Sequence, residues 1–358
     1  MHKHLFCILF SLIFSLFFTV TQGKDTNGEA VNTIGGEELI KRAAELFETN
    51  TDEAEAYSIK VLELGIKEKN ESLTSKAYYQ LVRISFKRCL YEKAIEYAKL
   101  AETGFKKSNN LYELANLYHT WATGLLHMGD NDQFDYYSDL SIDLARKTNN
   151  YTALVRQLYT RATKAYQNDE IYLALDNLNE VLILAEKQPE LETTKAFSYS
   201  LLCNIYNDLN DKEQCKKHLL KGTSLFEKFG MNDHLTLCYS NLSALYLDNF
   251  LDSAYYFAQK ALQAQQKSKI EHSITIVSFA FFSYFDKIKN YDSAAYYINK
   301  SIQIAERYNH TKSVVIYVNE YFRICAGLYF AELVEYACFK ASIRPYQAHK
   351  KRNLVVLV

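Results

Sequence analysis

Nucleophiles and metal ligands are sparse in this sequence, and their spacing does not match the common catalytic motifs. There is no CxxC, no HExxH and no glycine-rich phosphate loop, and no serine has a glycine two residues away on both sides. His119 and His127 are eight residues apart, which is about 12 Å along a helix. That distance is too long for one metal ion without further ligands. We therefore expect no catalytic residues, no metal and no cofactor.

The cysteines offer one pairing of chemical interest. Cys203 and Cys215 are twelve residues apart, on either side of a polar turn. If the flanking segments pair as helices, these are the two small positions where the helices come closest, so a disulfide is geometrically plausible. The alternative is that both are small core residues, since free cysteine is among the most buried residue types. The spacing leaves both interpretations open.

The composition restricts the fold that positions these residues. The chain has 358 residues, with only 2 Pro and 11 Gly but 29 Tyr and 21 Phe. So few turn formers disfavour an all-β fold or many strand–helix–strand units, which need frequent tight turns. The net charge of −1 comes from 41 basic and 42 acidic residues. This balance argues against a nucleic-acid-binding or polybasic membrane-surface protein.

A repeat of about 40 residues runs through most of the chain. One set of mostly small or apolar residues, which we call the anchors, recurs at spacings of 39 to 41. A second set, also mostly small, lies seven positions after the anchors and includes Val61, Ala101 and Ser141. Each unit reads as two amphipathic helices joined by short polar turns. The pattern predicts an all-α, right-handed solenoid of seven to eight antiparallel helix pairs, in which each unit packs on its neighbours. The anchors are Ala54, Ala94, Phe134, Ala174, Cys215, Ala254 and Ala294.

The repeat resembles the tetratricopeptide (TPR) family. The stretches 204–215 and 241–254 look like the end of the first TPR helix, the turn and the small anchor of the second helix. The period of 40 exceeds the usual 34 of that family, which implies longer helices. The sequence segments 251–258 and 291–297 resemble segments of exported TPR sensor and regulator proteins of Bacteroidetes. Those proteins commonly continue into a transmembrane helix and an effector domain.

The two ends of the chain differ from the repeat. Residues 1–23 are expected to be a secretory signal peptide, because Leu5–Val20 is almost wholly apolar and Thr21–Gly23 offers small residues for cleavage. Residues 24–35 are expected to be a flexible lead-in, and 36–310 the TPR-like array. Atypical capping helices are expected over 311–343, and a basic, then apolar, tail over 344–358. The tail is either an ordinary end or the start of a membrane span.

The resemblance also implies where a partner would bind. In TPR-like arrays the first helix of each pair lines the concave inner groove. The repeat register places polar and aromatic side chains there, a composition typical of binding surfaces. The alternative is a concave wall that is simply solvated. The candidate groove residues are Tyr79, Arg83, Asn116, His119, Thr123, His127, Arg156, Tyr159, Thr163, Tyr166, Asn204 and Asn207.

These observations favour an exported, periplasmic or envelope-associated, non-enzymatic interaction module. We expect it to be the sensory part of a signalling or transcriptional regulator. Its groove would bind a protein, a peptide, a small ligand or a glycan, with no nucleic acid. The membrane would be involved only through a C-terminal span beyond the chain. The alternative is a structural adaptor of envelope complexes that acts through its convex face or by self-association.

Overall fold

The computed structural model describes residues 35–186, 188–268, 270 and 273–308. The expected signal peptide, nearly all of the lead-in, the capping helices over 311–343 and the tail over 344–358 lie outside these residues. Within the described part the chain is all-helical, with fourteen α-helices and no strand, which confirms the predicted fold class. No described helix is both long enough and apolar enough to span a membrane.

The helices form two compact units, divided between Asn110 and Leu111. The first unit contains α2 (Gly36–Leu46), α3 (Thr51–Lys67), α4 (Glu71–Lys87) and α5 (Tyr91–Lys107). The second unit contains α6 (Leu111–Met128), α7 (Asn131–Thr148), α8 (Tyr151–Gln167), α9 (Ile171–Ala185), α10 (Glu192–Asp208), α11 (Lys212–Lys228), α12 (Asn232–Tyr246), α13 (Leu251–Lys267), α14 (Ile274–Lys287) and α15 (Tyr291–Arg307), with a short 3₁₀ turn η2 (Pro189–Leu191) before α10.

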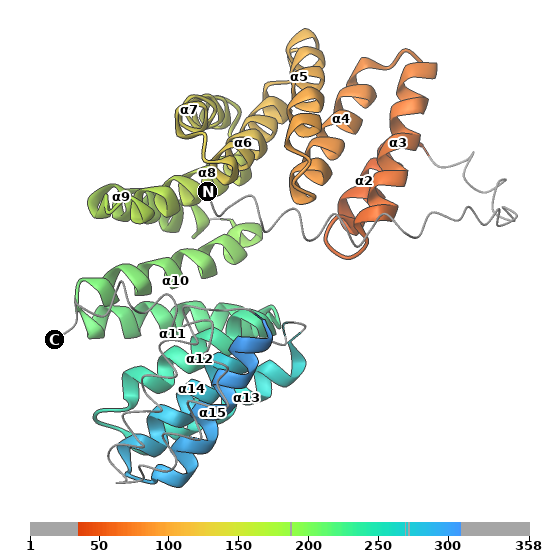
Figure 1. The fold of residues 1–358 in the computed structure, drawn as a ribbon. Helices are drawn as coiled ribbons and strands as arrows, with labels where there is room; N and C mark the ends of the chain where they lie inside the picture. Colours follow the sequence, from red (N-terminus) through yellow and green to blue (C-terminus); the bar gives the residue numbers. More distant parts are fainter. Residues whose placement is uncertain (1–34, 187, 269, 271–272, 309–358) are drawn as a thin grey trace, which may run out of the picture. The chain divides into compact units, whose positions relative to one another are not determined.

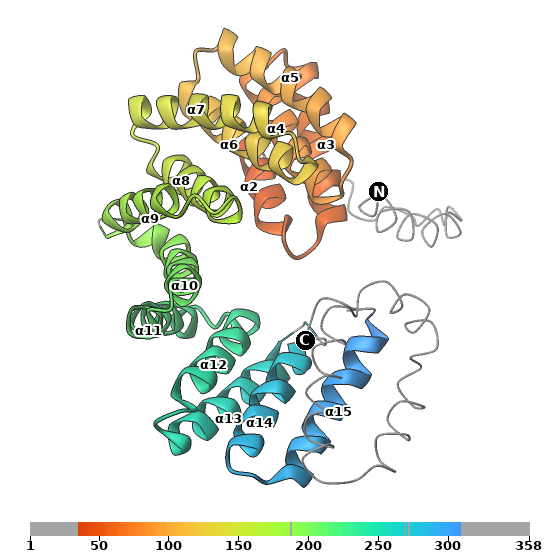
Figure 2. The same cartoon turned by 60° about the vertical axis from the view of Figure 1, so that its left-hand side comes forward.

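Successive helices pack as antiparallel pairs, each with an even-numbered first helix and an odd-numbered second helix (Figure 1). The described residues contain seven such pairs, from α2 and α3 to α14 and α15. Figure 2 shows α12 to α15 in the second unit as two adjacent pairs. Within each unit, neighbouring pairs pack on each other, as α3 does on α4 and α11 does on α12, so burial extends along each row of helices.

The turns explain how the chain makes so many reversals with few glycines. Most helices end at one residue in the left-handed conformation, with φ between 51° and 82°. Asparagine and aspartate tolerate this conformation better than other non-glycine residues. A cap follows directly, as when the Asn150 side chain accepts a hydrogen bond from the Ala153 amide. The left-handed residues fall about every twenty positions, at Lys69, Cys89, Asn109, Gly129, Asn149, Asp169, Asn210, Gly230 and Lys289.

The core follows the repeat register. All seven anchor residues are at most 2% exposed, and the small residues seven positions after them are also buried. At Gly222 a Cβ atom would lie 3.2 Å from the Ala196 carbonyl oxygen and 3.3 Å from Cβ of Tyr199, so α11 approaches α10 closely there. Several aromatic residues three positions after the anchors stack on the first helix of their own pair, as Tyr137 does on Trp121 at 4.2 Å.

Candidate functional site

The first helices of the second unit present a continuous set of polar and aromatic side chains, which we call the first-helix face. Its members come from α6, α8 and α10, at positions spaced three or four residues apart, which lie on one side of a helix. Four of them are exposed and the others are half-buried. The exposed members are His127, Arg156, Asn204 and Asn207, and the half-buried members are Asn116, His119, Thr123, Tyr159, Thr163 and Tyr166.

Side-chain hydrogen bonds fix α8 against α6 at this face. The Asn150 side chain donates to the Tyr112 carbonyl at 3.1 Å and to Oδ1 of Asn116 at 3.0 Å. Asn116 in turn donates to Glu113 at 3.0 Å. Asn150 is only 1% exposed and also caps α8, so one side chain starts the helix and sets its register on α6. The amide of Asn116 is therefore held in a single orientation.

Aromatic contacts continue the face from α8 to α10 and α12. The ring centroids of Tyr159 and Phe197 are 6.3 Å apart, and those of Phe197 and His234 are 4.8 Å apart, edge to face. The Tyr159 ring also packs against two of the unit's apolar clusters. Tyr159 is therefore partly a core residue, and its hydroxyl is the part that suits recognition.

Three titratable groups on the face have shifted pKa values. Burial, assisted by the charge of Arg156 and opposed by the hydrogen bond that His119 donates to Gln157, lowers the pKa of His119 to about 4. Burial raises the pKa of Tyr159. A hydrogen bond to Asp208 raises the pKa of Tyr166 to about 12. At neutral pH these three groups are uncharged.

Arg156 is the permanently charged member of the first-helix face. It is exposed, and it makes no ion pair with any residue of the described ranges. The neighbouring Arg161 on the same helix, by contrast, pairs with Asp139 at 3.1 Å. An unpaired guanidinium beside neutral hydrogen-bonding groups is suited to hold an anionic or carbonyl group of a ligand.

Two of the predicted groove residues, Tyr79 and Arg83, belong to the first unit. Arg83 donates to Oε1 of Gln80 at 2.8 Å, and its guanidinium lies 4.1 Å from the ring centroid of Phe47. This cation–π contact engages its head group within the first unit. The first-helix face, as defined here, comprises second-unit residues alone.

Sequence reasoning missed Gln157 and Phe197, which contact members of the first-helix face without belonging to it. Gln157 is fully buried and bonds to both His119 and Ser138, and Phe197 bridges Tyr159 to His234. A signal for Gln157 was present, because the residue one repeat earlier is the core residue Leu117. A polar residue at an apolar register position indicates a buried hydrogen-bond network.

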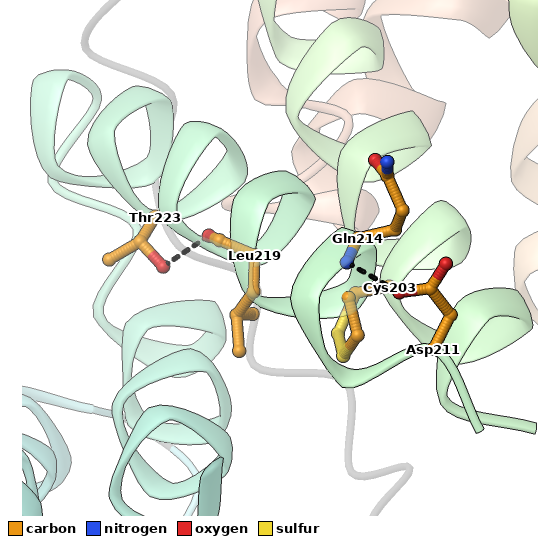
Figure 3. Close-up of a disulfide and its surroundings, with 6 residues drawn as sticks. Cys203, Asp211, Gln214, Leu219 and Thr223 are labelled. Atoms are coloured by element: carbon orange, nitrogen blue, oxygen red, sulfur yellow. Dashed lines mark hydrogen bonds between the residues drawn. A yellow bond between two sulfur atoms is a disulfide. The ribbon is translucent and has the colours of Figure 1, made fainter. Parts of the chain in front are cut away.

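A disulfide joins α10 to α11 between Cys203 and Cys215, whose Cα atoms are 3.9 Å apart (Figure 3). Both side chains are buried. Asp211 caps α11 between them by accepting a hydrogen bond from the Gln214 amide at 3.0 Å. Among the described cysteines, Cys89 is exposed and free, whereas Cys238 is buried and free. Burial raises the pKa of the Cys238 thiol to about 11.

The metal interpretation of the histidines gains no support from their surroundings. No group of three His, Cys, Asp or Glu side chains in the described part of the chain is arranged to hold a metal ion. His119 instead uses Nδ1 in a hydrogen bond to Gln157.

Comparison with known proteins identifies the architecture. The sequence matches no family model and has no significant match among curated proteins. Its structure is similar to the apo form of the quorum sensor NprR from B. thuringiensis, with a TM-score of 0.63, 11% identity, and coverage of 87% of this chain and 89% of that one.

Two further structures share the fold. The STAND protein PH0952 from Pyrococcus horikoshii, which carries a tetratricopeptide repeat sensor, gives a TM-score of 0.64 at 16% identity, covering 91% of this chain and 55% of that one. Yeast Tom70 gives 0.50 at 14% identity, covering 97% and 70%. These likenesses concern the fold: the chain has a TPR-like helical-repeat architecture.

Proposed function

We propose that this chain is a non-enzymatic interaction module that binds a peptide segment of a partner on the first-helix face. The observation that carries the proposal is that three successive first helices present neutral hydrogen-bonding and aromatic groups fixed to one another across the repeats. The bonds from Asn150 to Asn116 and from Tyr166 to Asp208, and the Tyr159–Phe197 contact, hold these groups in place. A surface that is already ordered binds without the cost of ordering it.

The charge of the face defines the peptide further. Arg156 offers an unpaired guanidinium among neutral groups, so the complementary peptide carries a carboxylate at that point. Neutral side chains such as Thr163 and Asn204 suit the amide groups of an extended backbone. The peptide is thus acidic at one position and neutral elsewhere.

The experiment is a selection from a synthetic library of random decapeptides against the purified chain. We expect Arg156→Ala to weaken the selected peptides and Arg156→Glu to weaken them more, while the melting temperature stays unchanged because Arg156 is exposed. Lys147→Ala is the matched control, since Lys147 is an exposed cation on the second helix α7. Equal effects of Arg156→Ala and Lys147→Ala would contradict the proposed surface.

We further propose that the chain is exported and forms the periplasmic sensory part of a signalling regulator. The apolar run Leu5–Val20 and the disulfide between Cys203 and Cys215 support export, because disulfides persist in oxidising compartments. NprR and PH0952, which share the fold, are described as a quorum sensor and as carrying a repeat sensor. Mass spectrometry of the protein from its native host should find a chain that starts at Lys24, and retention of Leu5–Val20 would contradict this assignment.

A second candidate function, a structural adaptor, is favoured by the large apolar side chains that the second helices α7 and α9 expose. Tyr172, Leu173 and Ile183 of α9 are 87%, 46% and 63% exposed, and Tyr136 of α7 is 61% exposed. Exposed aromatic side chains such as Tyr172 and Tyr136 are enriched at protein contacts. Sedimentation of the wild type and of Tyr172→Lys/Ile183→Lys tests self-association: a concentration-dependent dimer lost in the variant would favour the adaptor.

A further inference from the structure

His119 is held by a chain of hydrogen bonds that begins in the core. Nε2 of Gln157 donates to Oγ of Ser138 at 2.8 Å, so the amide oxygen of Gln157 faces the imidazole. That oxygen lies 2.8 Å from Nδ1 of His119. Gln157 and Ser138 are both fully buried, so water does not compete for either bond. The three residues come from α6, α7 and α8, which makes the chain of bonds part of the packing between two repeats.

This arrangement determines which ring nitrogen carries the proton. An amide oxygen only accepts hydrogen bonds, so Nδ1 of His119 is the protonated nitrogen. Because its pKa is about 4, the ring is neutral at physiological pH and has one proton. Nε2 therefore carries a lone pair. No described side chain bonds to Nε2, and His119 is only half-buried, so this acceptor is open to a ligand.

We propose that Nε2 of His119 accepts a hydrogen bond from a backbone N–H of an extended peptide, and that Gln157 and Ser138 are positioning residues that hold the imidazole in the accepting tautomer. This inference rests on the proposed function and adds the recognition chemistry at one point of the face. It makes His119 a binding residue for the peptide backbone.

The surroundings of His119 select a neutral donor. Arg156 lies close enough for its charge to act on the imidazole, so an ammonium or guanidinium donor at Nε2 would be repelled. A carboxylate of the ligand has no proton to donate to Nε2, and it would pair with Arg156 instead. Among the neutral donors of a peptide, the backbone N–H occurs at every residue, and Arg156 can hold a nearby carboxylate of the same peptide.

The tautomer is testable without any ligand. In ¹⁵N NMR of the whole chain, the imidazole of His119 should show Nδ1 protonated and Nε2 unprotonated at neutral pH. Gln157→Leu should release this preference, whereas Gln80→Leu should leave it unchanged, because Gln80 is a buried glutamine that bonds to Arg83 in the first unit. A wild-type signal with the proton on Nε2 would mean that the Gln157 amide has the opposite orientation, and it would overturn the proposal.

The second arm uses a decapeptide selected from the random library and a set of its singly N-methylated versions. Replacing the critical N–H by N–CH₃ should weaken binding to the wild type about ten- to hundred-fold, because an acceptor loses its partner. The same methylation should change binding to His119→Phe less than about three-fold, because that variant has no acceptor to leave unpaired.

The outcomes separate this inference from the proposed function. If the library yields no peptide that Arg156→Ala weakens, the proposed function fails and the inference fails with it. If such a peptide is found but no N-methyl position couples to His119, the inference alone is wrong. Coupling at one position, together with protonation at Nδ1, supports both.

Discussion

The bond between Cys203 and Cys215 should make the stability of the second unit depend on redox conditions. The two residues are twelve positions apart, so the bond closes a loop of about a dozen residues across the turn between α10 and α11. The loss of chain entropy in the unfolded state predicts a contribution of about 3 kcal/mol for a loop of this size. In a unit of this length, that corresponds to a rise of about 6 to 12 °C in melting temperature.

The assay compares circular-dichroism melting with and without a reductant. Cys203→Ala/Cys215→Ala is the matched control, because alanine fits where the Cα atoms are 3.9 Å apart and has no thiol. Reductant should lower the melting temperature of the wild type and leave the variant unchanged.

The thiols must be counted after unfolding, because both sulfurs are buried and would resist alkylation in the folded protein even if they were free. Alkylation in guanidinium without reductant should leave Cys203 and Cys215 unmodified. If both become alkylated, and the wild type melts at the same temperature with and without reductant, the disulfide is absent and the cysteines are ordinary core residues.

Three further predictions test the packing, the turns and the electrostatics. Phe134→Ala should lower the free energy of unfolding by about 3–5 kcal/mol in urea titrations, because the ring is fully buried. The control is Tyr136→Ala, on the exposed side of the same helix, which should change the free energy of unfolding by less than about 0.5 kcal/mol. Cys89→Gly should raise the free energy of unfolding by about 1 kcal/mol in the same titrations, because Cys89 has a φ of 59° and glycine adopts this left-handed conformation without steric cost. A lower free energy of unfolding would contradict the left-handed conformation at this position. The pKa of His119 is about 4 in the folded chain against 6.5 for the unperturbed side chain, so protonation favours the unfolded state. Its contribution of up to about 3 kcal/mol should be lost as the pH falls from 6.5 to 4, and a wild-type minus His119→Gln difference that is constant with pH would contradict it.

The architecture could be predicted because the same physical signal recurs every 40 residues. Anchors such as Ala94 and Ala174 are buried wherever the register places them, and Asn150 and Asp211 cap helices as their positions in the turns suggest. These features depend on residues close together in the chain, so they can be predicted from one sequence. The left-handed turn residues could also have been found from the twenty-residue spacing of Asn109 and Asn149.

Other features depend on packing between repeats and were not predictable. The division between Asn110 and Leu111 falls in a turn of the same type as the others, so composition gives no sign of it. The role of Gln157 depends on which residues α6 and α7 bring beside it. The repeat register places Tyr159 in the groove alone, because its sequence position does not reveal that its ring also contacts the core.

The central claim is that a peptide binds on the first-helix face, and photo-crosslinking tests it most directly. Benzoylphenylalanine replaces Asn204, which is exposed on the first helix α10, or Tyr172, which is exposed on the second helix α9. Each protein is irradiated with the same biotinylated decapeptide from the library selection. We expect a crosslinked product from the Asn204 position and none from the Tyr172 position. A product from the Tyr172 position alone would contradict the claim and place binding on the second helices.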